Sequence, residues 1–183
     1  MVEIIKHHGA ALELLTPVHA DSRGYFGESW KSSWNSVGLD FTVAQTNICW
    51  TEHRHTLRGM HAQYGSASVA KLVRVIKGEI LDVFVDAREG SISYGDWTGV
   101  RLSKPGQAVY VPRGFYHGYV TLTDDVLVTY HQDNVYDSAL ECGLSFADNA
   151  DFWRQQGLDP ETFTVSDKDL RQPFWLDCRK FTL

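Results

Sequence analysis

Residues 71–88, KLVRVIKGEILDVFVDAR, carry the clearest pattern of hydrophobic and polar positions in the chain. Two runs rich in β-branched residues flank Lys77, Gly78 and Glu79, and this pattern predicts a β-hairpin. Shorter apolar runs with Gly, Pro, Asp and Ser between them predict more strands. Short strands at close intervals are typical of β-barrels and β-sandwiches, so we expect one of these folds. The further strands are expected at residues 41–49, 97–102, 108–111, 118–122 and 126–132.

Helical patterns are few and short. Residues 31–37 and 151–156 are each long enough for about two turns at best. Helices are therefore expected to decorate the sheets and not to build the fold. No period repeats internally, and 183 residues is the size of one domain. We expect a single all-β domain over residues 1–183.

Composition narrows the class of protein. The chain is 43% hydrophobic and 22% charged, which is typical of a soluble globular protein. Its formal net charge of -6 argues against nucleic acid or an anionic membrane as a partner, because either needs an extended positive face. Glu3, Lys6 and Glu13 interrupt the apolar runs at the N-terminus, which leaves neither a secretory core nor a membrane span there.

The cysteines point to a reducing compartment. Cys49, Cys142 and Cys178 are odd in number, widely spaced and free of any C-x-x-C pattern. This arrangement suggests neither a disulfide framework nor a zinc ribbon. Together with the N-terminus, it predicts a cytoplasmic protein.

The segment GQAVYVPRGFYHG is the first with chemical interest. Its spacing of Gly106, Pro112, Gly114 and His117 resembles the second motif of the cupin barrels, although Thr121 stands where that motif ends in Asn. Pro112 removes a strand donor and Gly114 permits a turn, so the next strand can direct His117 into a barrel. The alternative is a half-buried strand histidine whose ring is satisfied.

Many cupins combine that histidine with an H-x-H pair followed by Glu, and so bind a metal. Here the residue two positions after His61 is Gln63, and the pair His53 and His55 lacks a Glu at the required spacing. Ligands distant in sequence could still converge. Exposed loop histidines are nevertheless the simpler explanation, so we expect no metal site.

The polar residues then left for chemistry include His61, His117, Lys71, Tyr130 and several arginines. A neutral imidazole that a carboxylate orients can abstract a proton, and a tyrosine across the substrate can return one. Such a pair suits a carbon acid next to a ketone.

Motifs over nearly the whole chain then indicate a family. The sequence resembles the dTDP-4-dehydrorhamnose 3,5-epimerase family in DSRGYFGESW, QTN at 45–47, LRGMHAQ, KLVRVIKGEILDVFVDAR, GDWTGVRLS, VPRGFYHGY, TYHQDNVYD and SDKD at 166–169. The resemblance implies a cupin-type jelly-roll barrel with a few short helices. It also implies a homodimer that needs no metal or organic cofactor.

The resemblance implies the following site. His61 would be the base, Asp169 its carboxylate partner, Tyr130 the acid on the opposite face, and Lys71 the group that stabilises the enolate. Arg23 and Arg58 would contact the diphosphate of a dTDP-linked sugar. Substrate-binding positions would be Arg23, Phe26, Glu28, Gln45, Asn47, Arg58, His117 and Tyr136.

Structural alternatives exist for four of these residues. Lys71 could be a solvated lysine on an edge strand, and Arg58 a loop anchor. Tyr130 could belong to the core, and Asp169 could be a helix N-terminal residue or a loop cap.

The stretch HTLRGMHAQ at residues 55–63 places a guanidinium, a glycine and an imidazole close together. We expect Gly59 to let the backbone pass close to the ligand. Odd spacing along an extended segment should give Arg58 and His61 different directions. Arg58 would then hold phosphate while His61 reaches carbon.

The expected activity is inversion of a nucleotide-linked 4-keto-6-deoxyhexose at C3, at C5 or at both. Alternatives are a 3-epimerase, a keto-sugar isomerase, an inert sugar-binding cupin and a metal-dependent cupin oxygenase. Cys49, His131 and the loop AQYGSASVA depart from the family pattern and are expected in or near the pocket. They leave the exact sugar and nucleotide open.

Overall fold

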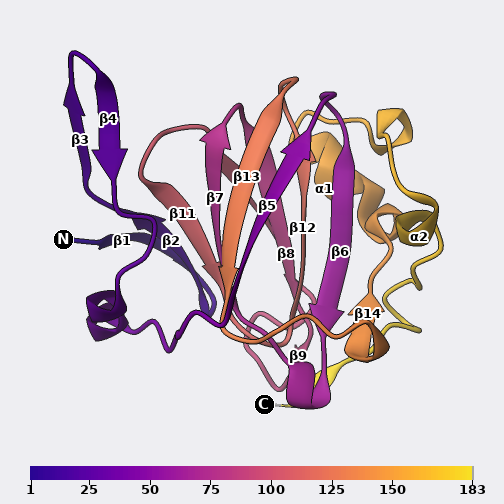
Figure 1. Cartoon of the computed structure of the whole chain (residues 1–183). Helices are drawn as coiled ribbons and strands as arrows, with labels where there is room; N and C mark the ends of the chain where they lie inside the picture. Colours follow the sequence, from indigo (N-terminus) through magenta and orange to yellow (C-terminus); the bar gives the residue numbers. More distant parts are fainter. Residues whose placement is uncertain (183) are drawn as a thin grey trace.

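The structure is a computed structural model that describes residues 1–182. Two antiparallel sheets pack face to face in a jelly-roll barrel, which confirms the predicted fold class (Figure 1). One sheet has the strand order β1 (Glu3–His8), β2 (Ala11–Leu15), β11 (Gln107–Val111), β7 (Lys71–Lys77), β13 (Val126–Gln132) and β5 (Gln45–Thr51). The other has the order β10 (Trp97–Leu102), β8 (Ile80–Asp86), β12 (Phe115–Thr121), β6 (Leu57–Gln63) and β14 (Glu141–Gly143).

Side chains from both sheets meet in an interior core. Val73 and Val128 of the six-stranded sheet pack with Phe84 and Tyr119 of the five-stranded sheet. A second core lies on the other face of the five-stranded sheet, so β8 is buried along its whole length. This double burial explains why its sequence, ILDVFVD, is almost continuously apolar.

Short helices cover the outer face of the five-stranded sheet (Figure 1). Helix α1 (Ala150–Gln155) begins at the cap Asn149 and buries Phe152 and Trp153 in the second core. Helix α2 (Asp167–Leu170) follows and lies against β6. The 3-10 helices are η1 (Ser32–Val37), η2 (Gly65–Ala67), η3 (Ser138–Leu140), η4 (Phe146–Asn149) and η5 (Pro160–Thr162).

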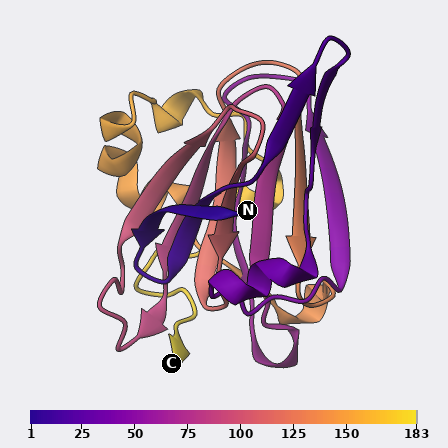
Figure 2. The ribbon, with the colours of Figure 1, turned by 90° about the vertical axis from the view of Figure 1, so that its left-hand side faces the viewer.

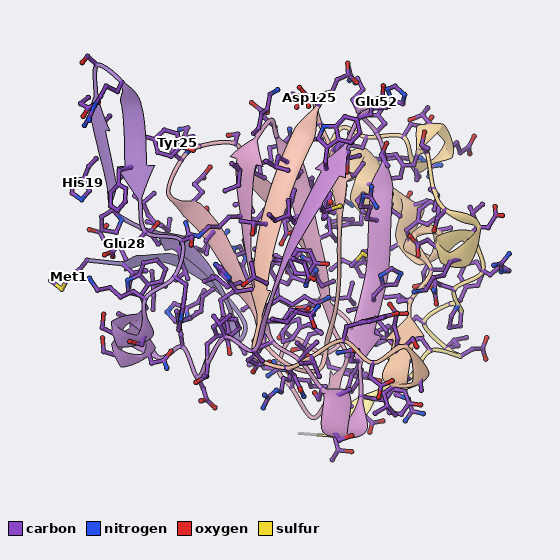
Figure 3. All side chains as sticks on the ribbon, in the orientation of Figure 1. Met1, His19, Tyr25, Glu28, Glu52 and Asp125 are labelled. Carbon is purple, nitrogen blue, oxygen red and sulfur yellow. The ribbon has the colours of Figure 1, made fainter. Side chains whose placement is uncertain are left out.

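The segment around η1 covers the outer face of the six-stranded sheet (Figure 2). There Trp34 of η1 packs in a third core with Leu14 and Leu72. Before η1, strands β3 (Val18–Asp21) and β4 (Gly24–Gly27) pair in a hairpin that projects from the body (Figure 1). Figure 3 shows His19 and Tyr25 on this hairpin and Glu28 at its base. Residues 18–28 are called the arm below.

Most predicted elements are confirmed. The hairpin over 71–88 forms β7 and β8, and the strands expected at 97–102 and 126–132 are β10 and β13. The strand expected at 41–49 instead runs over Gln45–Thr51, and Phe41 lies before it in the third core.

The structure differs from the predictions in the type of one helix and in several additional strands. The helix at 31–37 is a 3-10 helix, and α1 covers most of 151–156. Strands β1–β4, β9, β14 and β15 were not predicted, and β6 was expected only as an extended segment around Arg58 and His61. That residues 1–183 form one domain remains a prediction, and residue 183 lies outside the described part. Strand β15 (Phe181–Thr182) pairs with β9 (Arg88–Glu89) near the C-terminus.

Candidate active site

A pocket of about 590 Å³ lies between the walls formed by the two sheets. A smaller pocket of about 290 Å³ shares His61, Lys71, Tyr130 and Tyr136 with it, so the two are lobes of one site. The site gathers most residues that the sequence predicted, namely His61, Tyr130, Asp169, Lys71, Gln45, Asn47, Arg58, His117 and Tyr136.

His61 of β6 and Asp169 of α2 form a hydrogen-bonded pair in this pocket. The His61 Nε2 to Asp169 Oδ1 distance is 2.6 Å, and the Gly59 amide donates to the other carboxylate oxygen at 3.3 Å. Burial opposes ionisation of Asp169, but its hydrogen bond with His61 and the charge of that ring outweigh burial and lower its pKa. Ser166 caps α2 and Asp169 lies in the first turn of that helix, so Asp169 is a helix N-terminal residue as well as the partner of His61.

The geometry of this pair selects the reactive nitrogen of His61. An ionised carboxylate only accepts hydrogen bonds, so Nε2 must carry the hydrogen and donate it in the bond with Asp169. In the neutral ring Nδ1 is then unprotonated and available as a base. Its neighbour is Glu141, whose Oε1 lies 3.8 Å away and which also binds Lys168 and the Tyr136 hydroxyl.

A register shift places Arg58 and His61 on the same side of β6. His61 pairs with His117 and Arg58 pairs with Tyr119, so three residue steps along β6 match two residue steps along β12. The additional residue reverses the alternation of side chains. Both side chains line the pocket, and the prediction that they point in different directions is wrong.

Gly59 lies within this irregular stretch, and its small size serves strand packing. A Cβ atom at Gly59 would lie 2.6 Å from the Cα of Gly118 on β12, and a Cβ at Gly118 would lie 2.5 Å from the Arg58 carbonyl oxygen. Gly59 was expected to let the backbone pass close to the ligand. In the structure it instead lets β6 pass close to β12. Gly118 is the matching residue that sequence reasoning missed.

Tyr130 and Lys71 come from the opposite sheet. Tyr130 lies on β13 and Lys71 begins β7, whereas His61 lies on β6 of the five-stranded sheet. Burial raises the pKa of Tyr130, so its hydroxyl stays protonated near neutral pH. Strand β7 lies between β11 and β13, which rules out the edge-strand explanation of Lys71. Burial lowers the pKa of Lys71 to about 8, against the opposing effects of Asp82 and Glu141.

The remaining polar side chains fix the walls of the pocket. Gln45 donates to Asn47 at 2.8 Å, Asn47 donates to Gln132 at 2.7 Å, and the Tyr136 amide donates to Gln45 at 2.9 Å. Arg58 donates to the Thr51 hydroxyl at 3.0 Å, so it is anchored as well as directed at the pocket.

His117 is buried and forms a hydrogen bond with Asp82 at 2.8 Å. Asp82, Glu141 and Lys168 were not predicted as site residues, although Asp82 and Lys168 lie within the segments KLVRVIKGEILDVFVDAR and SDKD. Within residues 1–182, no group of three or more His, Cys, Asp or Glu side chains is arranged to hold a metal ion. In the same part of the chain, no helix has the length and apolar character needed to cross a membrane.

Comparison with known proteins identifies the family. The family model described as dTDP-4-dehydrorhamnose 3,5-epimerase matches residues 9–177. The chain belongs to the dTDP-4-dehydrorhamnose 3,5-epimerase family. A relative of that name from Methanothermobacter thermautotrophicus is 40% identical over 133 residues, which cover 72% of this chain and 71% of the relative.

Solved structures agree with this assignment to the epimerase family. The dTDP-4-dehydrorhamnose 3,5-epimerase from Sulfolobus tokodaii superposes with a TM-score of 0.86 at 29% identity, over 98% of each chain. ChmJ, a 3'-monoepimerase from Streptomyces bikiniensis solved in complex with dTDP-quinovose, gives a TM-score of 0.76 at 31% identity. That match covers 90% of this chain and 83% of ChmJ.

Three residues that the epimerase motifs assign to the site lie away from this pocket. Arg23, Phe26 and Glu28 belong to the arm and line neither lobe. The Arg23 side chain is 87% exposed and pairs with Asp21 on the same hairpin. Within one chain the structure therefore does not bring the arm to His61.

Some of the residues that depart from the epimerase family pattern line the pocket, and His131 does not. Cys49 lines the larger lobe, and Gln63 lines the smaller one. His131 lies on the other side of β13 from Tyr130 and contacts the Thr46 hydroxyl at 2.9 Å. The prediction that His131 lies in or near the pocket is wrong, because alternation along β13 turns it to the outer face.

Proposed function

We propose that the chain is a cofactor-independent isomerase that epimerises a dTDP-linked 4-keto-6-deoxyhexose. The observation that carries this proposal is the placement of two proton-transfer groups on opposite walls of one pocket. His61 with Asp169 stands on the five-stranded side, and Tyr130 stands on the six-stranded side.

The chemistry follows from this placement. His61 Nδ1 takes the proton from a carbon next to the C4 ketone, and the electron pair moves to the ketone oxygen as an enolate. Lys71 stabilises that oxygen. Tyr130 then donates its proton to the same carbon from the opposite face, which inverts the centre. Protons and charge balance within these groups, and solvent restores both side chains.

The rest of the pocket would hold the nucleotide and the sugar. The Arg58 guanidinium matches the geometry of a diphosphate. The hydrogen-bonded side-chain amides of Gln45 and Asn47 offer polar contacts to the sugar and the base, as do His117 and Tyr136. Anchoring the nucleotide in this way positions the ring between base and acid.

We propose a homodimer in which each arm serves the pocket of the partner. Strand β5 is an edge strand, and its outward side chains Ile48 and Trp50 are 75% and 56% exposed. An apolar sheet edge of this kind favours pairing with a second copy. Arg23, Phe26 and Glu28 lie outside their own pocket, and in this dimer they would contact the substrate in the pocket of the partner.

Two candidate activities differ in how many carbon centres of the sugar are inverted. Inversion at both C3 and C5 is in keeping with the relatives named 3,5-epimerases, and ChmJ keeps inversion at C3 alone as the second candidate. A cytoplasmic location suits Cys49, Cys142 and Cys178, all of which are free thiols.

Proton exchange tests the proposed activity directly. Wild-type protein and His61→Asn are incubated in heavy water with dTDP-4-keto-6-deoxyglucose, and NMR locates deuterium on the sugar. Wild type should introduce deuterium at C3, at C5 or at both. His61→Asn should lose exchange while its circular dichroism stays unchanged, because the ring reacts and does not support the fold. Wild-type exchange in the variant would require another base.

A further inference from the structure

Asp82 is a carboxylate inside the core, and packing does not explain it. Its side chain is fully buried on β8, between the apolar residues Leu81 and Val83. One oxygen binds His117 Nε2 at 2.8 Å, and the other oxygen has no hydrogen-bond partner. A buried carboxylate with an unpaired oxygen costs stability, which suggests a purpose other than folding.

The second group that Asp82 influences is Lys71, which begins β7 in the other sheet and lines the pocket beside His117. The charge of Asp82 is the largest influence that favours protonated Lys71, ahead of Glu141 and Cys142. The Lys71 ammonium has no hydrogen bond or ion pair within residues 1–182. Lys71 and His117 both line the pocket, whereas Asp82 lies behind them.

The groups around His117 have opposing effects on its pKa. Burial lowers the pKa of His117, Asp82 opposes this effect, and Lys71 and His61 add to it. The ring is therefore neutral near pH 7. Because the carboxylate accepts the hydrogen bond, Nε2 carries the ring proton and Nδ1 keeps a lone pair.

We propose that Asp82 is a positioning residue of the reaction, which fixes the tautomer of His117 and supplies the opposite charge that keeps Lys71 protonated at the enolate oxygen. This inference rests on the proposed epimerase function. Asp82 touches neither substrate nor reacting atoms, and it acts through the two side chains in front of it. It thereby sets the upper pH limit of the reaction.

The pH profile of kcat/KM tests this role. In wild type, activity should fall above about pH 8, where Lys71 loses its proton. Asp82→Asn keeps the size of the side chain but removes its charge, so this alkaline limb should move down by about one pH unit or more. An alkaline limb within about 0.3 units of wild type would overturn the proposal.

Asp86→Asn is the matched control. Asp86 is a second buried carboxylate on β8, but it pairs with Arg88 and lines neither lobe of the site. Its removal should lower the unfolding midpoint and leave the alkaline limb in place. An equal displacement of the limb in both variants would mean that loss of any buried charge on β8 is enough, and would overturn the specific role of Asp82.

A measurement on the unaltered protein covers the case in which Asp82→Asn does not fold. Nitrogen-15 NMR of the histidine rings, without substrate, should show His117 as the Nε2-protonated tautomer at neutral pH. A ring protonated at Nδ1 would overturn the inference. Since no sugar is present, this result is independent of whether wild type epimerises the keto sugar, so failure of the proposed function remains separately visible.

Discussion

A single hydrogen bond decides which nitrogen of His61 can take a proton. Asp169 is 108 residues away in the sequence and reaches Nε2 only because α2 lies against β6. The motifs LRGMHAQ and SDKD predicted the pair by resemblance, but no pattern could indicate which ring nitrogen is bound. Asp82 and Glu141 could not be predicted either, because an isolated acidic residue in a strand has no signal until its neighbours across the barrel are known.

Tyr130→Phe should separate the two halves of the reaction. Abstraction by His61 needs no phenol, so deuterium should still enter the sugar in heavy water. Reprotonation from the opposite face needs the hydroxyl, so inversion should fall about 10²-fold or more. NMR measures exchange and epimer yield in one sample, and most of the deuterium should enter with retention.

Tyr116→Phe provides the control for loss of a buried phenol. The Tyr116 hydroxyl donates to the Arg179 carbonyl oxygen at 2.8 Å and lies outside the pocket. This variant should lose some stability and keep the wild-type ratio of inversion to exchange. If Tyr130→Phe also kept that ratio, the acid would have to be His117 or water.

Among the elements, β6 shows most clearly where sequence reasoning stops. An extended segment could be expected at residues 55–63, and strict alternation would have placed Arg58 and His61 on opposite faces. The register shift against β12 overturns this alternation. At this irregularity Gly59 and Gly118 approach each other closely, and the two residues come from separate motifs. Such a contact depends on strand pairing and cannot be deduced from either motif alone.

Gly59→Ala should therefore impair both stability and activity. The backbone at Gly59 has a φ of +125°, and the added methyl group would meet the backbone of Gly118 and His117. We expect a loss of about 3 kcal/mol in the free energy of unfolding and a large loss of turnover, because His61 must move. Urea denaturation and the exchange assay measure the two effects.

Gly65→Ala isolates the part that comes from backbone conformation. Gly65 also has a positive φ, of +59°, but nothing lies within 4 Å of an added Cβ. Its loss should be about 1 kcal/mol, with activity retained. Equal effects at both positions would show that the contact between β6 and β12 does not matter.

For the whole molecule, the sheets could be predicted and the arm could not. Burial on one or both faces imposes a pattern on β7, β8, β10 and β13, and the sequence shows it. The strands of the arm are almost entirely exposed, so no hydrophobic pattern marks them. The motif DSRGYFGESW predicted that Arg23 and Glu28 bind substrate, but it could not indicate that they lie outside the pocket of their own chain.

The proposed dimer predicts recovery of activity from two inactive variants. Light scattering should first give about twice 20.7 kDa, and a monomer would contradict the arrangement. His61→Asn keeps a normal arm, and a double variant, Arg23→Ala with Phe26→Ala, keeps a normal His61. Each alone should have little activity. If each arm serves the partner, a mixed dimer contains one pocket with both a working His61 and a working arm.

Random exchange of subunits at equal amounts makes about half of the dimers mixed, so about one quarter of all pockets become complete. Mixing after mild unfolding and refolding should therefore restore roughly a quarter of wild-type turnover. An arm that folded back onto its own pocket would leave no complete pocket in any dimer. Turnover that stays at the level of the separate variants, while light scattering still shows dimers, would thus assign the arm to its own chain or to no site at all.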